Sequence, residues 1–263
     1  MKGIEWYFPR TLEEVIPLLK GEGIIPHGGG TGILRTRLNR IKGLIDLSHL
    51  PLHFFQHSHY TVKIGATQTF AEVIEQLDQT YILTKALGLS ASTPLRHRIT
   101  IGGSVALFPA WSDLMGPLIA LEAEVSLVGK PQGTFPIAQY VTDSKLRGGT
   151  LITGIEFRND SWISYYHREA RTHFDYPAFT ITILLKRTHN KIEDIRIGIV
   201  GCVGKFKRLF NLEDALKGRG VDEVEVPTGL DVAFTAKKFM SPEYLKHLAG
   251  VYIEKGLQTV LRD

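Results

Sequence analysis

The sequence contains two glycine-rich stretches, His27-Gly28-Gly29-Gly30-Thr31-Gly32-Ile33 and Thr100-Ile101-Gly102-Gly103-Ser104-Val105-Ala106. We expect each stretch to be a loop that follows an extended segment, Ile24-Ile25-Pro26 before the first and Arg98-Ile99 before the second. Glycines leave backbone N–H groups uncovered, so a bridging diphosphate can approach the main chain closely. One such stretch is equally compatible with an ordinary turn. Two of them, each followed by an apolar segment, favour a long, two-ended ligand such as a dinucleotide.

Length and composition are those of an ordinary globular protein. The chain has 263 residues, of which 43% are hydrophobic and 22% charged, enough for two domains and a sizeable core. No stretch reaches the roughly 18 to 20 apolar residues of a membrane span, and residues 1–6 lack the apolar core of a signal peptide. Cys202 is the only cysteine, which excludes an internal disulfide and a cluster held by four cysteines of this chain. We expect a cytoplasmic protein.

The charge distribution does not favour a nucleic-acid partner. The formal net charge is +4, but the basic residues are scattered and lack the aromatic interleaving of a nucleic-acid-binding surface. They favour a solvated face or a docking surface for an acidic partner, with the arginine-rich stretch 35–40 as one candidate. The densest groups are Arg35, Arg37 and Arg40, then Arg168 and Arg171, then Lys205, Lys207 and Arg208.

Capping patterns and apolar periodicity predict several helices and strands in the first 160 residues. Thr11-Leu12-Glu13-Glu14 and Thr69-Phe70-Ala71-Glu72 have the spacing of a capping box, and each predicts the start of a helix. Asp113 is in position to cap a third helix that ends at Leu121. Strands are predicted at residues 24–26, 44–47, 62–66, 125–128 and 151–157.

The composition changes at Arg158-Asn159-Asp160-Ser161, which we interpret as a domain boundary. Beyond it we expect an antiparallel hairpin with a longer loop. Its two strand-like runs are 179–186 and 195–200, and the connection is Arg187-Thr188-His189-Asn190. The final helix begins after Ser241, with Pro242 in the first helical position. The pattern predicts an α+β chain with a larger first domain and a smaller second one.

Further motifs follow the glycine stretches in a fixed order. They are Ser112-Asp113-Leu114, Ala120-Leu121-Glu122-Ala123-Glu124-Val125, Tyr166-His167-Arg168, Asp175-Tyr176, and the run from Ser241 to Ala249. Together with both glycine stretches, this ordered set resembles the FAD-binding medium subunit of the molybdenum hydroxylases, the family of carbon monoxide dehydrogenase and bacterial xanthine dehydrogenase relatives. The resemblance covers nearly the whole chain.

The resemblance implies a p-cresol-methylhydroxylase-type FAD-binding fold of two subdomains plus a small C-terminal α+β domain. The FAD-binding domain would be residues 1–160, with subdomains of about 1–52 and 53–160, and the C-terminal domain of the flavin subunit would be 161–263. The implied FAD-binding residues are Gly28, Gly29, Gly30, Thr31, Gly32, Ile33, Ser90, Thr100, Ile101, Gly102, Gly103, Ser104, Asp113, Ile152, His167 and Tyr176.

The resemblance also implies individual roles. Both glycine stretches would line the FAD diphosphate, and Asp113 would accept a hydrogen bond from a ribose or ribityl hydroxyl. Ile152 would pack against the flavin, Tyr176 would cover the isoalloxazine ring, and Ser90 would be a further flavin contact. His167 stands where the family usually has lysine or arginine; a neutral histidine there donates one hydrogen bond but holds no full positive charge near the flavin.

Several of these residues have simpler interpretations. Asp113 is also suited to be only a helix cap, and Tyr176 to be a core aromatic residue with a satisfied hydroxyl. His27 adjoins the first stretch and suggests a covalent flavin bond, but the resemblance is to a subfamily with noncovalent FAD. Cys202 is expected to be inert packing. The histidines His53, His57 and His59 lack a matching set of carboxylates or cysteines, so we predict no metal site.

The function predicted from the resemblance is electron transfer within a complex. The chain would accept electrons from a [2Fe-2S] small subunit and pass them through FAD to NAD or another acceptor, while substrate is oxidised in a molybdopterin large subunit. No catalytic residues of its own are predicted, because the cofactor carries the redox chemistry. Two alternatives stay open: a self-sufficient flavin reductase or oxidase of the same fold, and a nonredox nucleotide-binding module used for assembly.

Overall fold

The computed structural model describes residues 3–35, 40–173, 175–221, 224 and 229–262. Consecutive helices and consecutive strands form separate runs along much of the chain, which confirms the predicted α+β class. The chain divides into two compact units: unit 1 is residues 1–76, 91–108 and 121–159, and unit 2 is residues 77–90, 109–120 and 160–263. In the described part of the chain, no helix is long and apolar enough to cross a membrane.

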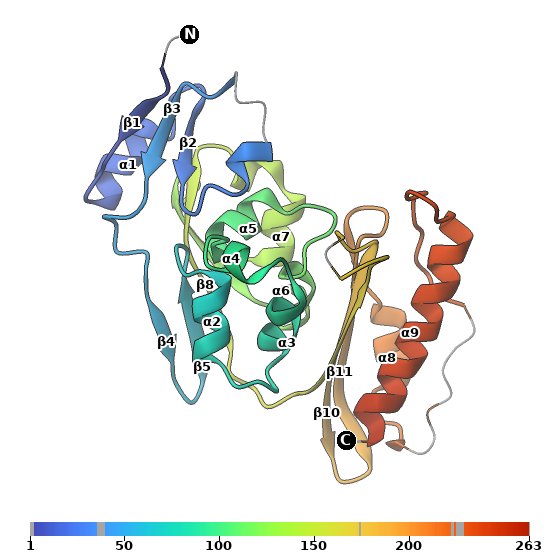
Figure 1. The fold of residues 1–263 in the computed structure, drawn as a ribbon. Helices are drawn as coiled ribbons and strands as arrows, with labels where there is room; N and C mark the ends of the chain where they lie inside the picture. Colours follow the sequence, from blue (N-terminus) through green and yellow to red (C-terminus); the bar gives the residue numbers. More distant parts are fainter. Residues whose placement is uncertain (1–2, 36–39, 174, 222–223, 225–228, 263) are drawn as a thin grey trace. The chain divides into compact units, whose positions relative to one another are not determined.

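The N-terminal part of unit 1 is a small parallel sheet with one helix. Its strand order is β1-β3-β2 (Figure 1), with β1 at Glu5–Tyr7, β3 at Gly43–Asp46 and β2 at Ile24–His27. Helix α1, Leu12–Leu18, begins as predicted, because the Glu14 amide donates to Oγ1 of Thr11 at 3.3 Å. Val15 of α1 and Ile45 of β3 are fully buried in the core of this part.

The remainder of unit 1 is built on an antiparallel five-stranded sheet in the order β4-β5-β8-β6-β7. The strands are β4 Phe55–His57, β5 Thr61–Gly65, β8 Thr150–Arg158, β6 Glu124–Gly129 and β7 Gly133–Pro136. The helices are α2 Phe70–Gln76, α4 Thr93–Arg96, α5 Ile101–Leu107 and α7 Ile137–Thr142, and α5 packs on β5 and β8. The capping box of α2 is confirmed, since Thr69 N donates to Glu72 Oε2 at 2.7 Å and Glu72 N to Thr69 Oγ1 at 3.3 Å.

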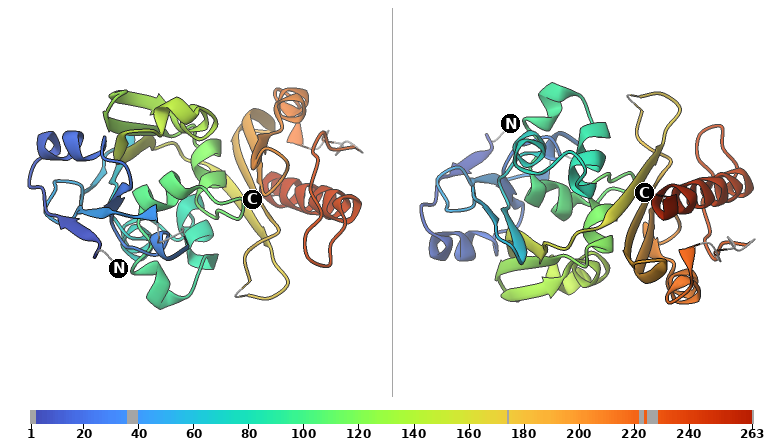
Figure 2. Two further views of the ribbon diagram at one scale, coloured as in Figure 1. Left: turned by 90° about the horizontal axis from the view of Figure 1, so that it is seen from above. Right: turned by 90° about the horizontal axis from the view of Figure 1, so that it is seen from below.

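Unit 2 contains an antiparallel sheet in the order β12-β11-β10-β9. The strands are β9 Ile163–Glu169, β10 Phe179–Thr188, β11 Lys191–Val200 and β12 Phe206–Arg208. Helix α9, Pro242–Arg262, packs along one face (Figure 2), where Ile181 and Ile183 of β10 join Leu245 and Ile253 of α9 in a fully buried cluster. Helix α8, Phe210–Leu216, also packs on β11.

The opposite face of this sheet carries polar residues. Thr180 and Thr182 alternate with the apolar residues of β10, and Gly116 of helix α6 (Met115–Ala120) packs against both hydroxyls. Helix α3, Ile82–Leu89, packs on β9, and Lys85 Nζ donates to the carbonyl oxygen of Ser164 at 2.8 Å. The segments 77–90 and 109–120 therefore belong structurally with the C-terminal sheet.

Three expectations from the sequence are wrong. The second glycine stretch is not a loop but the first turn of α5, and Arg98 before it lies in a turn rather than an extended segment. The connection between β10 and β11 is only His189-Asn190, because both strands extend further than their apolar runs. His189 adopts φ +55°, which supports the tight turn. Arg37 of the arginine-rich stretch lies outside the described residues.

Candidate cofactor site

The first glycine stretch follows the carboxyl end of β2 and leads into a short 3₁₀ turn at Ile33–Arg35. Gly30 has φ +77°, a conformation in which glycine is favoured. The Ile33 amide donates to the carbonyl oxygen of Gly30 at 3.2 Å. Within the described residues, the five amides from Gly28 to Gly32 donate to no protein acceptor. Successive unpaired amides of this kind form a concave binding surface for anions.

The second glycine stretch is held by its helix. Thr100 is the N-cap of α5, and its Oγ1 accepts a hydrogen bond from the Gly103 amide at 3.2 Å. The Gly102 amide donates to the carbonyl oxygen of Ala66 at 2.8 Å. A Cβ on Gly102 would lie 2.7 Å from the Cβ of Ala66, so only glycine permits the backbone of α5 to approach Ala66 this closely. The stretch therefore has a fixed backbone before any ligand binds.

The structure brings the two glycine stretches together within unit 1, although they lie about seventy residues apart in sequence. A Cβ on Gly28 would be 3.1 Å from Oγ1 of Thr100, and a Cβ on Gly29 would overlap the carbonyl oxygen of Arg98. The Arg98 side chain also donates from Nη2 to the carbonyl oxygen of Gly29 at 3.2 Å. The two stretches thus form one continuous surface, with unpaired amides on one side of it.

Ile152 also belongs to unit 1 and lies in β8, opposite Leu127 of β6. It is buried, with 4% of its surface exposed. The pairing register between β6 and β8 shifts next to this position, between Ser126 and Leu127. An aliphatic side chain here is an ordinary core residue of the sheet.

Asp113, in unit 2, is almost fully buried and hydrogen-bonded. Its Oδ1 accepts from Oη of Tyr166 at 2.8 Å and from Nε of Arg168 at 3.0 Å. Burial raises the pKa of the Asp113 carboxyl, and the Arg168 charge opposes that shift. Within the described residues, Oδ2 accepts no hydrogen bond. One oxygen of the carboxylate is therefore fixed by Tyr166 and Arg168.

Asp113 does not cap α6, so that interpretation is wrong. The Met115 amide donates instead to Oγ of Ser112 at 3.3 Å. The helix is also shorter than expected and ends at Ala120. The Asp113 side chain turns toward β9, where burial and the negative charge of Asp113 raise the pKa of Tyr166 well above its ordinary value.

Tyr176 is exposed, not buried in a core. It has 61% of its surface accessible, and its ring centroid lies 5.0 Å from that of Trp111 in the same unit. The preceding residue is anchored, because Arg168 Nη2 donates to the carbonyl oxygen of Asp175 at 2.7 Å. Arg168 thereby links the Asp113 carboxylate to the segment that carries Tyr176.

His167 lies on the other face of the β9 sheet from Asp113. Its ring stacks on Tyr252 of α9, with ring centroids 3.4 Å apart, and Nε2 lies 3.1 Å from Glu169 Oε2. Burial lowers the pKa of His167, although the Glu169 carboxylate opposes the shift. Successive residues of a strand face opposite sides, so His167 and Arg168 cannot share one pocket.

Ser90 is buried at the end of α3 and donates from Oγ to the carbonyl oxygen of Leu87 at 2.7 Å.

Tyr166 and Arg168 are the residues of this site that the sequence analysis did not select. Both appeared in a motif around His167, and Arg168 also as one of the scattered basic residues. The period-two alternation of a strand would have placed residues 164, 166 and 168 on one face, but β9 itself was not predicted. Recognising the strand was the missing step.

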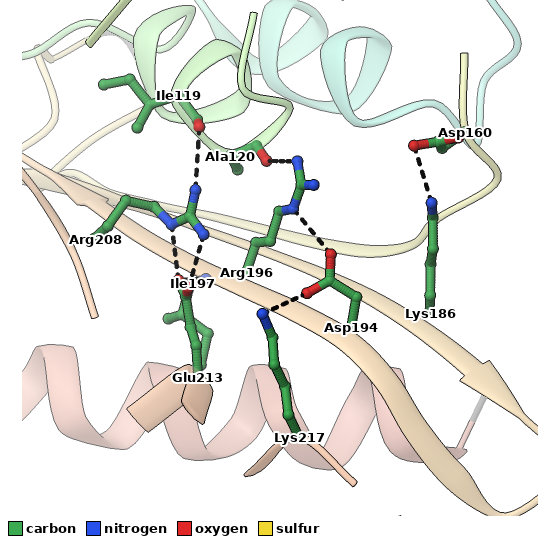
Figure 3. A network of polar contacts seen from close by, with 10 residues as sticks. All are labelled: Ile119, Ala120, Asp160, Lys186, Asp194, Arg196, Ile197, Arg208, Glu213 and Lys217. Atoms are coloured by element: carbon green, nitrogen blue, oxygen red, sulfur yellow. Dashed lines mark hydrogen bonds and ion pairs between the residues drawn. The ribbon is translucent and has the colours of Figure 1, made fainter. Parts of the chain in front are cut away.

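A second polar network fixes α6 on the sheet (Figure 3). Arg208 makes a two-point contact with Glu213, from Nε to Oε1 and from Nη2 to Oε2, both at 2.7 Å. Nη1 of Arg208 donates to the carbonyl oxygen of Ile119 at 3.4 Å. Nη1 of Arg196 donates to the carbonyl oxygen of Ala120 at 2.9 Å. Two arginines thus satisfy carbonyls at the C-terminus of α6. This arrangement holds the short segment that also carries Asp113.

No metal site is formed by the parts of the chain that are described: no three of their histidine, cysteine, aspartate or glutamate side chains gather in one place. Nε2 of His53 lies 3.3 Å from Oε1 of Glu72, and Nε2 of His57 lies 2.9 Å from the side-chain Nδ2 of Asn159. Cys202 is buried, and burial raises the pKa of its thiol.

Comparison with known proteins adds independent information. Residues 2–157 match the family described as the FAD binding domain in molybdopterin dehydrogenase. The nicotine 6-hydroxylase medium subunit of Paenarthrobacter nicotinovorans is 25% identical over 241 residues, covering 83% of this chain and 81% of the relative. The carbon monoxide dehydrogenase medium chain of Hydrogenophaga pseudoflava is 24% identical over 248 residues, 87% and 85% of the two chains. A structure of reconstituted CO dehydrogenase from Oligotropha carboxidovorans superposes with a TM-score of 0.90 at 20% identity, over 99% and 98% of the chains.

Proposed function

The chain belongs to the family of the FAD binding domain in molybdopterin dehydrogenase, and we propose that it passes electrons from a [2Fe-2S] partner subunit through FAD to NAD or another acceptor. It is an oxidoreductase component, the FAD-binding subunit of a molybdenum hydroxylase. Membership of the family is established by the match; the path of the electrons is what we propose. Bound FAD would supply the redox chemistry, and this chain would bind and orient it.

The observation that carries the proposal is the pairing of the two glycine stretches. The amides of Gly28 to Gly32 have no acceptor within the described residues, and they adjoin Thr100 at the start of α5. A diphosphate is an anion whose oxygens accept several hydrogen bonds at once, so it fits such a surface. We propose that Gly28–Ile33 and Thr100–Ser104 line the FAD diphosphate, and that Ile152 packs against the flavin.

For unit 2 we propose two further contacts, each supported by the surroundings of the residue itself. Asp113 Oδ2 would accept a hydrogen bond from a ribose or ribityl hydroxyl, because only Oδ1 is engaged by Tyr166 and Arg168. Tyr176 would cover the isoalloxazine ring, since its own ring is largely exposed. His167 is not among the contacts we propose, because its ring stacks on Tyr252 of α9. Ser90 stays a proposed contact through its oxygen lone pairs, since its proton is donated to Leu87.

The partners are also proposals. The relatives are named as a medium subunit and a medium chain, which supports a complex with a [2Fe-2S] small subunit and a molybdopterin large subunit. We propose that residues 161–263, which follow the family match, form the C-terminal domain of the flavin subunit, and residues 1–160 the FAD-binding domain with subdomains of about 1–52 and 53–160. The cytoplasmic location stays a prediction.

Anaerobic titration tests the electron path. The flavoprotein would be reduced with dithionite, and NAD or an artificial acceptor would then be added. We expect the flavin to be reduced and then reoxidised by the acceptor. A flavin that dithionite cannot reduce would support the nonredox module. Rapid, continuous NADH oxidation by oxygen without partner subunits would support the self-sufficient reductase.

A further inference from the structure

Arg98 contacts Gly29 in two separate ways. Its side chain donates from Nη2 to the carbonyl oxygen of Gly29 at 3.2 Å. Its own main-chain carbonyl oxygen packs directly on the Cα of Gly29, at the place where any other residue would carry a Cβ. The main chain and the side chain of one arginine therefore enclose a single peptide of the first glycine stretch.

The main chain of Arg98 is itself held in place. It lies in the turn between α4 and α5, where the amides of Arg98 and Ile99 both donate to the carbonyl oxygen of Leu95, at 2.9 and 2.8 Å. Thr100 follows at once as the N-cap of α5. Arg98 thus projects from a short, hydrogen-bonded connection and not from a free loop.

Among the described residues, the Arg98 side chain donates to the carbonyl oxygen of Gly29 alone, and no carboxylate pairs with it. The neighbouring Arg96 differs. Its Nη1 donates to the carbonyl oxygen of Ala91 at 3.0 Å and its Nη2 to Oγ1 of Thr93 at 2.9 Å, so its side chain contacts residues at the start of α4. Arg96, at the end of α4, and Arg98, in the turn that follows, therefore bind different partners.

We propose that Arg98 is a positioning residue for the diphosphate of FAD, acting through the peptide between Gly29 and Gly30. In a trans peptide the C=O of one residue and the N–H of the next point in opposite directions. Holding the Gly29 carbonyl toward Arg98 therefore aims the Gly30 amide away from Arg98, on the side where the ligand would be. This inference rests on the proposed FAD site and adds the residue that fixes its geometry.

The test compares three variants of the full chain, or of the complex if the chain is obtained only in that form. Arg98→Met removes the donor and keeps the aliphatic length, Arg98→Lys restores one donor, and Arg96→Met is the matched control. The FAD dissociation rate would be measured at low and high salt. The melting temperature of the FAD-free protein would be measured alongside.

We expect Arg98→Met to release FAD about tenfold faster, the loss of one charge-assisted hydrogen bond, at both salt concentrations and with little change in melting temperature. Arg98→Lys should recover most of the loss, and Arg96→Met should release FAD like wild type. Unchanged release in Arg98→Met, or an equal effect in Arg96→Met, would overturn the inference. An effect that disappears at high salt would also overturn it, since that outcome indicates long-range attraction. A wild-type protein without FAD would instead refute the proposed function.

Discussion

Oδ1 of Asp113 lies 3.0 Å from Nε of Arg168, and the two side chains are only 8% and 10% exposed. This buried ion pair joins the segment before α6 to strand β9. Tyr166 adds a second donor to the same oxygen. The carboxylate is therefore oriented by the protein alone, which is what a residue must provide if it is to accept a ligand hydroxyl in a fixed position.

Replacing Arg168 by methionine should strongly destabilise the chain. It leaves Asp113 with a buried negative charge and no positive partner, and removing one member of such a pair typically costs about 3 to 5 kcal/mol. Urea unfolding measures the effect. The double variant Asp113→Asn/Arg168→Met should recover part of the loss, because no buried charge remains. If the stability losses of the two single substitutions simply add in the double variant, the unpaired charge of Asp113 is not what destabilises Arg168→Met.

Replacing Tyr176 by alanine should change flavin reactivity more than stability. The residue is largely exposed and contacts the ring of Trp111, so we expect a loss of about 1 kcal/mol or less. Reoxidation of the reduced flavin by oxygen should be faster, because the ring would no longer exclude water. Tyr244→Ala, at another half-exposed tyrosine, is the control. Equal reoxidation rates in all three proteins would refute the covering role.

His167 predicts a specific dependence of stability on pH. Its pKa in the folded chain is lowered below 6.5 by burial, so the unfolded chain binds the proton more tightly. The free energy of unfolding should therefore fall as the pH drops below 6.5, and this contribution should level off below the folded-state pKa. The groups that face it are Glu169, Lys255 and Tyr252. In His167→Gln the free energy of unfolding should fall less with decreasing pH than in wild type. An identical fall in both proteins would show that other groups cause it.

Two glycine substitutions separate folding from cofactor binding. A Cβ on Gly29 would overlap the Arg98 carbonyl, so Gly29→Ala should destabilise even the FAD-free protein, by roughly 1 to 3 kcal/mol. Among the described residues, a Cβ on Gly32 would meet Leu107, at 3.4 and 4.0 Å, so the fold should tolerate Gly32→Ala. FAD affinity should nevertheless fall by about fivefold, the value of one hindered hydrogen bond. Unchanged affinity in Gly32→Ala would argue against this amide as a diphosphate ligand.

Much of the fold could be predicted because local signals agree with it. The capping box at Thr69 and the cap at Ser241 both form, the latter with the Tyr244 amide donating to Oγ at 3.2 Å. The alternation of Val62 and Ile64 corresponds to fully buried positions in β5. The p-cresol-methylhydroxylase-type fold expected from the ordered motifs is confirmed by the family match and the structural similarity.

The failures have physical causes that a single sequence does not show. Gly102 and Gly103 argue against a helix by propensity, yet α5 forms because Thr100 caps it and Gly102 fits against Ala66. Strand β9 was missed because its Asp113-facing side is polar, with Tyr166 and Arg168 in alternating positions. Those polar residues can be buried only because the Asp113 carboxylate, distant in sequence, accepts hydrogen bonds from them. That partner is known only from the tertiary structure.

The most direct test of this account is the identity and stoichiometry of the flavin in the purified wild-type protein. The chain would be precipitated with acid and the supernatant analysed by chromatography against FAD, FMN and riboflavin standards. We predict one FAD per chain, released entirely into the supernatant. No flavin, a different flavin, or flavin that stays with the precipitated protein would contradict a noncovalent FAD site at the two glycine stretches.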